Sequence, residues 1–296
     1  MINKVAIIGA GTMGNGIAHV FAQHQRQVSL FDISETALEK ALHTIEKNLH
    51  RQLNKGLLDE KTKTDALANL SLKTDLKEAV RGAHLVVEAA TEDLVLKKEI
   101  FAKIDDLAPK DALLATNTSS ISITEIAATT QRPDKVIGMH FMNPVPVMKL
   151  LEVIRGYHTS DETTKIIIEE GKYLDKIPVE VNDYPGFVAN RILMPMINEA
   201  ISALHEGVAG VAEIDTVMKL GMAHPMGPLQ LADYIGLDVC LSILKVLHEG
   251  FGDPKYAPSP LLVNMVNAGH TGVKSGAGFY SWGQGLKDPI VAYRSR

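Results

Sequence analysis

The sequence predicts an α/β protein in which a doubly wound, largely parallel sheet is followed by an all-α domain. Over residues 1–183, short apolar runs of strand length alternate with segments whose apolar residues recur at helical spacing. Beyond them the spacing is helical throughout. The change falls at the turn-rich stretch Asn-Asp-Tyr-Pro-Gly-Phe at 182–187. We therefore place a first domain at residues 1–183 and a second at residues 184–296.

The composition excludes several classes of protein. The chain has 296 residues, of which 46% are hydrophobic, which is enough to bury the cores of two domains. Its net charge of −5 argues against nucleic acid as a partner, because binding to phosphates requires a basic face. The single cysteine, Cys240, lies between apolar residues and predicts a buried thiol, so we expect a cytoplasmic protein without disulfides. Apolar runs stay below the ~18 residues of a membrane span, and the glycine-interrupted N-terminus is predicted to be a strand rather than a signal peptide.

The first expected strand, residues 5–8, leads into a glycine-rich turn and a helix at residues 15–23. The turn reads Gly9, Ala10, Gly11, Thr12, Met13, Gly14, a G-x-G-x-x-G pattern. Its glycines permit a tight turn, close approach of a pyrophosphate and packing of the helix on the strand. The next strand, residues 28–31, ends in Asp32, which is placed to bind the ribose of NAD and to repel the extra phosphate of NADP. A turn that binds no ligand is the alternative; Asp32 argues against it, so we predict a Rossmann-type NAD-binding sheet.

Helical patterns and short apolar runs continue along the first domain. Ser34 is a cap residue for a long helix that ends at Lys55 and Gly56. On this helix Arg51 and Lys55 lie one turn apart, which indicates either a phosphate contact or an ordinary solvated face. Further strands are expected at residues 71–73, 85–89, 112–115, 136–139, 148–154 and 179–181, and further helices at residues 59–68, 76–81, 97–104, 123–128 and 163–173.

Polar residues follow two of these strands, at the ends where a doubly wound sheet binds its cofactor. Glu92 and Lys97 come after the strand at residues 85–89, and we expect both to lie near the cofactor. The strand at residues 112–115 leads into Thr-Asn-Thr-Ser-Ser at 116–120. A cap for the next helix would use one or two of these side chains. The surplus of hydroxyl groups therefore predicts hydrogen bonds to a ligand.

A histidine and a glutamate lie on opposite sides of an Asn-Pro-Val-Pro turn. His140 follows the apolar strand at residues 136–139, and Glu152 lies on the returning strand at residues 148–154. This hairpin would bring the carboxylate to one ring nitrogen, where it would fix the tautomer and stabilise the imidazolium. His140 is therefore a candidate general base. The alternative is a strand-end histidine that bonds only a backbone carbonyl.

The second domain is predicted to consist of helices with extensive apolar faces. A long helix begins near Val188 and carries Asn190 in its first turns, and Pro195 would kink it. The other expected elements are helices at residues 213–220 and 230–247 and a glycine-rich loop at residues 272–280 that carries Lys274. Surplus apolar helix surface commonly forms a subunit interface.

Six segments that span almost the whole chain carry a resemblance to a known family. They are GAGTMGNGIA at 9–18, VVEAATEDLVLKKEIF at 86–101, TNTSSISI at 116–123, GMHFMNPVPVMKLLEVI at 138–154, DYPGFVANRILMP at 183–195 and GVKSGAGFY at 272–280. With these segments, the chain resembles the L-3-hydroxyacyl-CoA dehydrogenases, in particular the stand-alone bacterial 3-hydroxybutyryl-CoA dehydrogenases. The resemblance implies an N-terminal NAD domain, a C-terminal helical domain for substrate and dimerisation, and a homodimer that acts on a small acyl-CoA.

By position in these motifs, the resemblance implies roles for individual residues. His140 corresponds to the catalytic base and Glu152 to its partner, and Ser119 and Asn190 complete the catalytic group. The implied NAD contacts, beyond the glycine turn and Asp32, are Glu92, Lys97, Ser119, Asn143 and Lys274; the implied CoA contacts are Lys55, Asn48 and Ser119. No metal ion is implied. Met142 and Tyr184 stand where many members have phenylalanine and threonine, and neither change removes a catalytic group.

The implied reaction interconverts an (S)-3-hydroxyacyl-CoA, such as 3-hydroxybutyryl-CoA, and a 3-ketoacyl-CoA, in β-oxidation of fatty acids or in butyrate metabolism. His140 would take the hydroxyl proton and NAD the hydride, while Ser119 and Asn190 would hold the substrate. One alternative is a sugar-acid dehydrogenase related to lens λ-crystallin, against which Lys55 and the NPVPVMKLLE segment favour acyl-CoA. A second alternative is a protein that binds NAD without catalysis, but such a protein would not need the complete catalytic group. A third is one module of a bifunctional enzyme, but the chain has no room for a hydratase domain.

Overall fold

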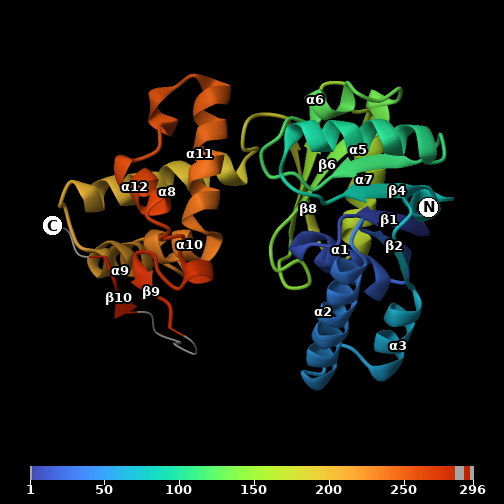
Figure 1. Cartoon of the computed structure of the whole chain (residues 1–296), viewed down its shortest axis with the longest axis horizontal. Helices are drawn as coiled ribbons and strands as arrows, with labels where there is room; N and C mark the ends of the chain where they lie inside the picture. The colour runs from blue at the N-terminus through green and yellow to red at the C-terminus, as the bar shows by residue number, and fades with distance from the viewer. Residues whose placement is uncertain (1, 284–289, 294–296) are drawn as a thin grey trace. The chain divides into compact units, whose positions relative to one another are not determined.

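The computed structural model describes residues 2–283 and 290–293, and the chain divides into two compact units, Met1–Tyr184 and Pro185–Arg296 (Figure 1). The first unit contains a sheet covered by helices, and the second is mainly helical. The predicted fold class, a doubly wound sheet followed by a helical domain, is therefore confirmed. Across the described residues, no helix is both long enough and apolar enough to cross a membrane.

Eight strands form the sheet of the first unit, in the order β3-β2-β1-β4-β5-β6-β7-β8. They are β1 Lys4–Ile8, β2 Gln27–Phe31, β3 Leu70–Lys73, β4 Leu85–Glu88, β5 Leu113–Thr116, β6 Val136–Phe141, β7 Leu150–Arg155 and β8 Ile177–Asn182. Neighbours are parallel except β6 and β7, which are antiparallel. Strand order reverses between β1 and β4, and the carboxyl ends at such a reversal are where these sheets bind ligands.

Most helices of the first unit begin after a serine or an aspartate whose side chain caps them. The helices of this unit are α1 Thr12–Gln23, α2 Glu35–Asn54, α3 Glu60–Ala68, α4 Leu76–Val80, α5 Leu94–Leu107, α6 Ile123–Ala127, the 3-10 turn η1 Pro133–Lys135, and α7 Asp161–Tyr173. Ser34 caps α2, because its side chain accepts a hydrogen bond from the backbone of Ala37 at 3.2 Å. Helices α2 and α3 pack side by side and extend away from the sheet (Figure 1).

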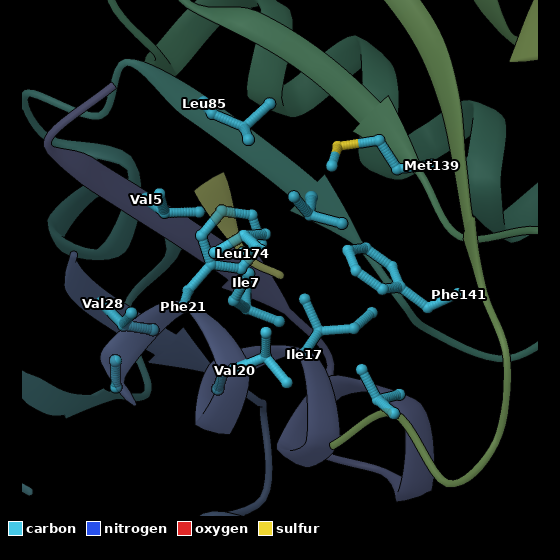
Figure 2. Packing of buried hydrophobic residues seen from close by; sticks show 14 of the residues in the cluster. Val5, Ile7, Ile17, Val20, Phe21, Val28, Leu85, Met139, Phe141 and Leu174 are labelled. Atoms are coloured by element: carbon cyan, nitrogen blue, oxygen red, sulfur yellow. The ribbon is translucent and has the colours of Figure 1, made fainter. Parts of the chain in front are cut away.

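The core of the first unit joins α1 to the sheet (Figure 2). Ile17 and Phe21 on α1 are fully buried, as is Ile7 on β1. The rings of Phe21 and Phe141 meet edge to face, with centroids 6.5 Å apart. Each such side chain stabilises the fold by about 1.5–3 kcal/mol. Because Phe141 follows His140 directly, this packing also fixes the end of β6.

The second unit differs from the prediction in three places. Residues 230–247 form two helices rather than one, because Gly236, with a φ of 104°, interrupts them. A further helix, α12, was not predicted, and the expected loop at 272–280 contains the turn η3 and reaches the strand β9, which pairs with β10. The elements are α8 Ala189–His205, α9 Val211–Gly221, α10 Pro228–Ile235, α11 Leu237–Phe251, η2 Pro254–Tyr256, α12 Pro260–Asn267, η3 Val273–Ser275, β9 Tyr280–Ser281 and β10 Ile290–Val291.

The helices of the second unit enclose an apolar core of their own. Cys240 on α11 is fully buried in it, and burial raises the pKa of this thiol to about 12. The thiol is therefore a packing group, as the sequence predicts. Pro195 lies inside α8.

Candidate active site

The glycine turn joins β1 to α1 at the middle of the sheet. Gly9 has a φ of 106°, and a Cβ there would lie 2.7 Å from the carbonyl oxygen of Ala89. A Cβ on Gly14 would overlap the carbonyl oxygen of Gly9. At Gly11, by contrast, a Cβ would meet no atom within 4 Å. Side chains are thus excluded at the two ends of the turn, and its middle is open to an approaching group.

The N-terminus of α1 and the carboxylate of Asp32 lie beside this turn. Gly11, the N-cap of α1, makes no side-chain cap bond, so the amides of the first helical turn are available to an anion. The Asp32 carboxylate accepts hydrogen bonds from the backbone N–H of Ala10 at 2.8 Å and of Ser34 at 2.9 Å. Uncapped amides fit a pyrophosphate, and a carboxylate at the end of β2 fits ribose hydroxyls. The turn therefore fits a dinucleotide.

His140 and Glu152 face each other across the antiparallel pair β6 and β7. The His140 Nδ1 and the Glu152 Oε2 lie 2.8 Å apart, and the residues are only 6% and 2% exposed. Side chains that pair in register on antiparallel strands point to the same face, which is why the hairpin brings these two together. With Nδ1–H donating to the carboxylate, the neutral imidazole has its basic lone pair on Nε2.

Ser119 lies on the other side of the imidazole, in the loop that follows β5. Its Oγ is 3.1 Å from His140 Nε2. The Glu92 carboxylate holds this loop: its Oε1 accepts from the Thr118 hydroxyl at 2.5 Å, the Ser119 backbone N–H at 2.8 Å and the Ser120 hydroxyl at 3.3 Å. The hydroxyl cluster that the sequence singled out is thus held by a glutamate from the neighbouring strand end.

Lys97 is deeply buried, at 1% exposed, beneath the same loop. Its ammonium forms ion pairs with Glu88 at 2.7 Å and with Glu92 at 3.4 Å. Glu88 is fully buried, and it is not among the predicted site residues. The available signal was an acidic residue at the end of the apolar run Leu-Val-Val-Glu, because a buried carboxylate requires partners.

The loop between β6 and β7 packs against α1. A Cβ on Gly16 would lie 2.9 Å from the Cβ of Val145, so the loop and the helix are in close contact. The buried ammonium of Lys176 donates to the carbonyl oxygens of Val145 and Met148, at 2.5 and 2.8 Å. Burial, with a smaller effect of a neighbouring lysine, lowers the pKa of Lys176 to about 8. Asn143, a predicted NAD contact, lies exposed in this loop.

The other four predicted site residues lie on other elements of the chain. Asn48 is half-buried on α2, and Lys55 is exposed at its C-terminal end. Asn190 and Lys274 belong to the second unit, where Asn190 is buried in the first turn of α8 and the exposed Lys274 pairs with Asp238 at 2.5 Å. Within the described residues, no group of three or more His, Cys, Asp or Glu side chains is arranged to hold a metal ion.

Two features of one Rossmann-type sheet define the class of the protein. One is the turn that fits a dinucleotide, and the other is the histidine held between a glutamate and a serine. The turn fits a nicotinamide cofactor, and the imidazole is set up to accept a proton. Together these are the groups that a dehydrogenase needs for the oxidation of an alcohol.

Comparisons with known proteins identify the family. The family model described as 3-hydroxyacyl-CoA dehydrogenase, NAD binding domain, matches residues 4–184, and the model of the C-terminal domain of these enzymes matches residues 186–282. The chain belongs to the 3-hydroxyacyl-CoA dehydrogenase family, and it is an oxidoreductase with NAD as its cofactor.

Individual relatives match over nearly their whole length. The chain is 52% identical to the probable 3-hydroxybutyryl-CoA dehydrogenase of Bacillus subtilis, over 95% of this chain and 98% of the relative. It is 50% identical to the 3-hydroxybutyryl-CoA dehydrogenase of Clostridioides difficile, over 94% and 99%. The crystal structure of the (S)-3-hydroxybutyryl-CoA dehydrogenase of Ralstonia eutropha is similar with a TM-score of 0.93 at 48% identity, over 96% of this chain and all of that one.

Proposed function

We propose that the protein interconverts (S)-3-hydroxybutyryl-CoA and acetoacetyl-CoA, with His140 as the general base. The observation that carries this proposal is the continuous line of contacts from Glu152 through His140 to Ser119, at 2.8 and 3.1 Å. The line lies at the carboxyl end of β6, which runs parallel to β5 in the sheet that carries the glycine turn. The names of the relatives support the four-carbon substrate.

In the oxidative direction, His140 Nε2 accepts the proton of the 3-hydroxyl group. Glu152 stabilises the imidazolium through the Nδ1–H bond at 2.8 Å and keeps the ring in one tautomer. The Ser119 hydroxyl, on the Nε2 side of the ring, holds the substrate oxygen in line for proton transfer. Bound NAD supplies the hydride acceptor. In the reductive direction the protonated imidazole donates to the keto oxygen.

The other site residues take the roles that the resemblance implies. The first unit binds NAD, and the helical unit binds substrate and forms a homodimer. Asn190 contributes to the catalytic group, Glu92, Lys97, Asn143 and Lys274 to NAD binding, and Asn48 and Lys55 to CoA binding. The exposure of Lys55 at the end of α2 supports a contact with a phosphate of CoA. We place the enzyme in the cytoplasm, in β-oxidation or in butyrate metabolism.

The first experiment follows NADH consumption with acetoacetyl-CoA and with acetoacetate, which lacks CoA. We expect turnover of the CoA ester only. Lys55→Ala should raise the KM for acetoacetyl-CoA about tenfold, which corresponds to about 1.4 kcal/mol of binding, and leave kcat unchanged. Lys47→Ala, a change of the same kind at another exposed lysine of α2, is the control. Wild-type protein that binds NADH and leaves acetoacetyl-CoA unreduced would refute the proposed substrate.

A further inference from the structure

The Glu88 carboxylate is completely enclosed by donors. It lies at the end of β4 and is 0% exposed. Its Oε1 accepts from the backbone N–H of Ala90 at 2.6 Å and from the Lys97 ammonium at 2.7 Å. Its Oε2 accepts from the same ammonium at 2.9 Å and from the Thr116 hydroxyl at 2.7 Å. A buried carboxylate with four such bonds holds its donors in place.

Two routes lead from Glu88 to the loop that carries Ser119. In the first, Lys97 joins Glu88 to Glu92, whose Oε1 accepts the Ser119 backbone N–H at 2.8 Å. In the second, the Thr116 hydroxyl donates to Glu88 and accepts the backbone N–H of Thr118 at 3.2 Å. Both routes end within one residue of Ser119. The position of its Oγ, 3.1 Å from His140 Nε2, therefore depends on a carboxylate that itself touches neither residue.

We infer that Glu88 is a positioning residue, which acts through Lys97, Glu92 and Thr116 to hold the Ser119 hydroxyl against His140. This inference rests on the proposed function, in which Ser119 and His140 meet the reacting oxygen. It also assigns Lys97 a second task. The buried ammonium is shared between two carboxylates, so it keeps Glu92 directed at the loop.

Glu88→Gln keeps the size of the side chain and removes its charge. An amide has one acceptor atom and two donor hydrogens, so it cannot accept from Lys97, Ala90 and Thr116 together. Lys97 is then left with Glu92 as its carboxylate partner, and the loop loses its fixed position. We expect kcat with NADH and acetoacetyl-CoA to fall on the order of 10–100-fold, because a misplacement of about 1 Å costs about 100-fold in rate.

A double-mutant cycle separates positioning from general damage. If Glu88 acts through the Ser119 hydroxyl, Glu88→Gln should matter only while that hydroxyl is present. It should then lower kcat strongly in the wild-type background but by less than about twofold in the Ser119→Ala background. If Glu88 supports the fold alone, the losses in kcat should multiply. Multiplying losses, or a Glu88→Gln enzyme with wild-type kcat, would overturn the inference.

Glu170→Gln is the matched control for loss of a buried charge. Glu170 is 5% exposed and forms a two-bond ion pair with Arg26 at 2.8 Å, outside the contacts described for Ser119. It should lower the melting temperature and leave kcat near the wild-type value. A kcat for Glu170→Gln as low as that of Glu88→Gln would show that stability alone explains the loss, and would overturn the inference.

Thr116→Val keeps the inference testable should Glu88→Gln not fold. It removes one of the two routes, leaves the ion pair intact and nearly preserves the shape of the side chain. We expect a smaller fall in kcat that disappears in the Ser119→Ala background. An unchanged kcat, or a loss that multiplies with the loss caused by Ser119→Ala, would count against the inference.

Wild-type protein is assayed first. Its failure to reduce acetoacetyl-CoA would refute the proposed function, whereas turnover with an insensitive Glu88 would refute the positioning role alone.

Discussion

Asp105 in the first unit and Asp233 in the second are both buried, at 3% and 1% exposed, yet the pKa values of their carboxyl groups shift in opposite directions. At Asp105, burial favours a raised pKa, but the backbone N–H of Gln131 and the guanidinium of Arg132 outweigh it and hold the pKa below its usual range. At Asp233, burial prevails and raises the pKa, and hydrogen bonds from the Trp282 indole and two backbone amides offset it only in part.

Other buried acids of the two units also differ in their hydrogen-bond partners. In the first unit the buried pairs are Glu152 with His140, Glu88 with Lys97, Glu170 with Arg26 and Asp105 with Arg132. In the second unit Asp215 accepts from the backbone N–H groups of Leu229 and Gln230 and from the Tyr280 hydroxyl. In the first unit, these buried carboxylates each pair with a basic side chain. The second uses carboxylates as acceptors that fix the start of α10 and the segment at β9.

Among the changes to the buried acids, Glu152→Gln should have the largest effect on activity. The amide cannot serve as a countercharge to the imidazolium, and it can donate to Nδ1 and so favour the wrong tautomer. We expect kcat to fall on the order of 10²–10⁴-fold while NADH affinity stays unchanged. Steady-state kinetics together with NADH fluorescence titration would measure both. A Glu152→Gln enzyme with wild-type kcat would mean that this buried pair is only structural.

Asp105→Asn should destabilise the protein more than Asp233→Asn does. The first change leaves the Arg132 guanidinium buried without its carboxylate, which costs about 3–5 kcal/mol. The second removes an acceptor from neutral donors, which costs about 1–3 kcal/mol. Urea unfolding followed by circular dichroism tests the order. Trp282, the one tryptophan of the chain, reports the second unit by fluorescence, and Asp233→Asn should shift that transition. If both variants lost the same free energy of unfolding, buried acids would not differ between the two units in this respect.

The pH dependence of stability should show a contribution from Lys176. Burial lowers its pKa in the folded state from 10.5 to about 8, with smaller effects from Lys149 and Asp175. Between these two values the unfolded chain binds a proton that the folded chain does not, so the free energy of unfolding rises with pH, by up to about 3 kcal/mol. Lys176→Met should abolish this rise in urea unfolding at pH values across the window. If the free energy of unfolding still rises in Lys176→Met, another group causes the rise.

Asp233 should contribute with the opposite sign. Its raised pKa means that its contribution to stability is complete below the ordinary carboxyl pKa and is lost as the pH rises through the raised value. Asp233→Asn should remove this decline from the transition that Trp282 reports. An unchanged decline in the variant would show that the carboxyl of Asp233 is not its source.

Much of the first unit was predictable because its signals are local. The glycine turn and the strands that alternate with helices depend on short-range patterns, and the contact of His140 with Glu152 follows from one hairpin. The role of Lys176 was hidden, because its partners are backbone carbonyls that leave no sequence pattern. In the second unit, the break at Gly236 was missed because the apolar spacing continues across it.

The role of His140 as the general base is tested most directly by NADH consumption with acetoacetyl-CoA. His140→Gln is compared with wild type and with the control His43→Gln, a change at an exposed histidine of α2. We expect that His43→Gln turns over normally and that His140→Gln binds NADH but loses kcat on the order of 10²–10⁴-fold. A His140→Gln enzyme with a kcat near the wild-type value would contradict the assignment of the general base.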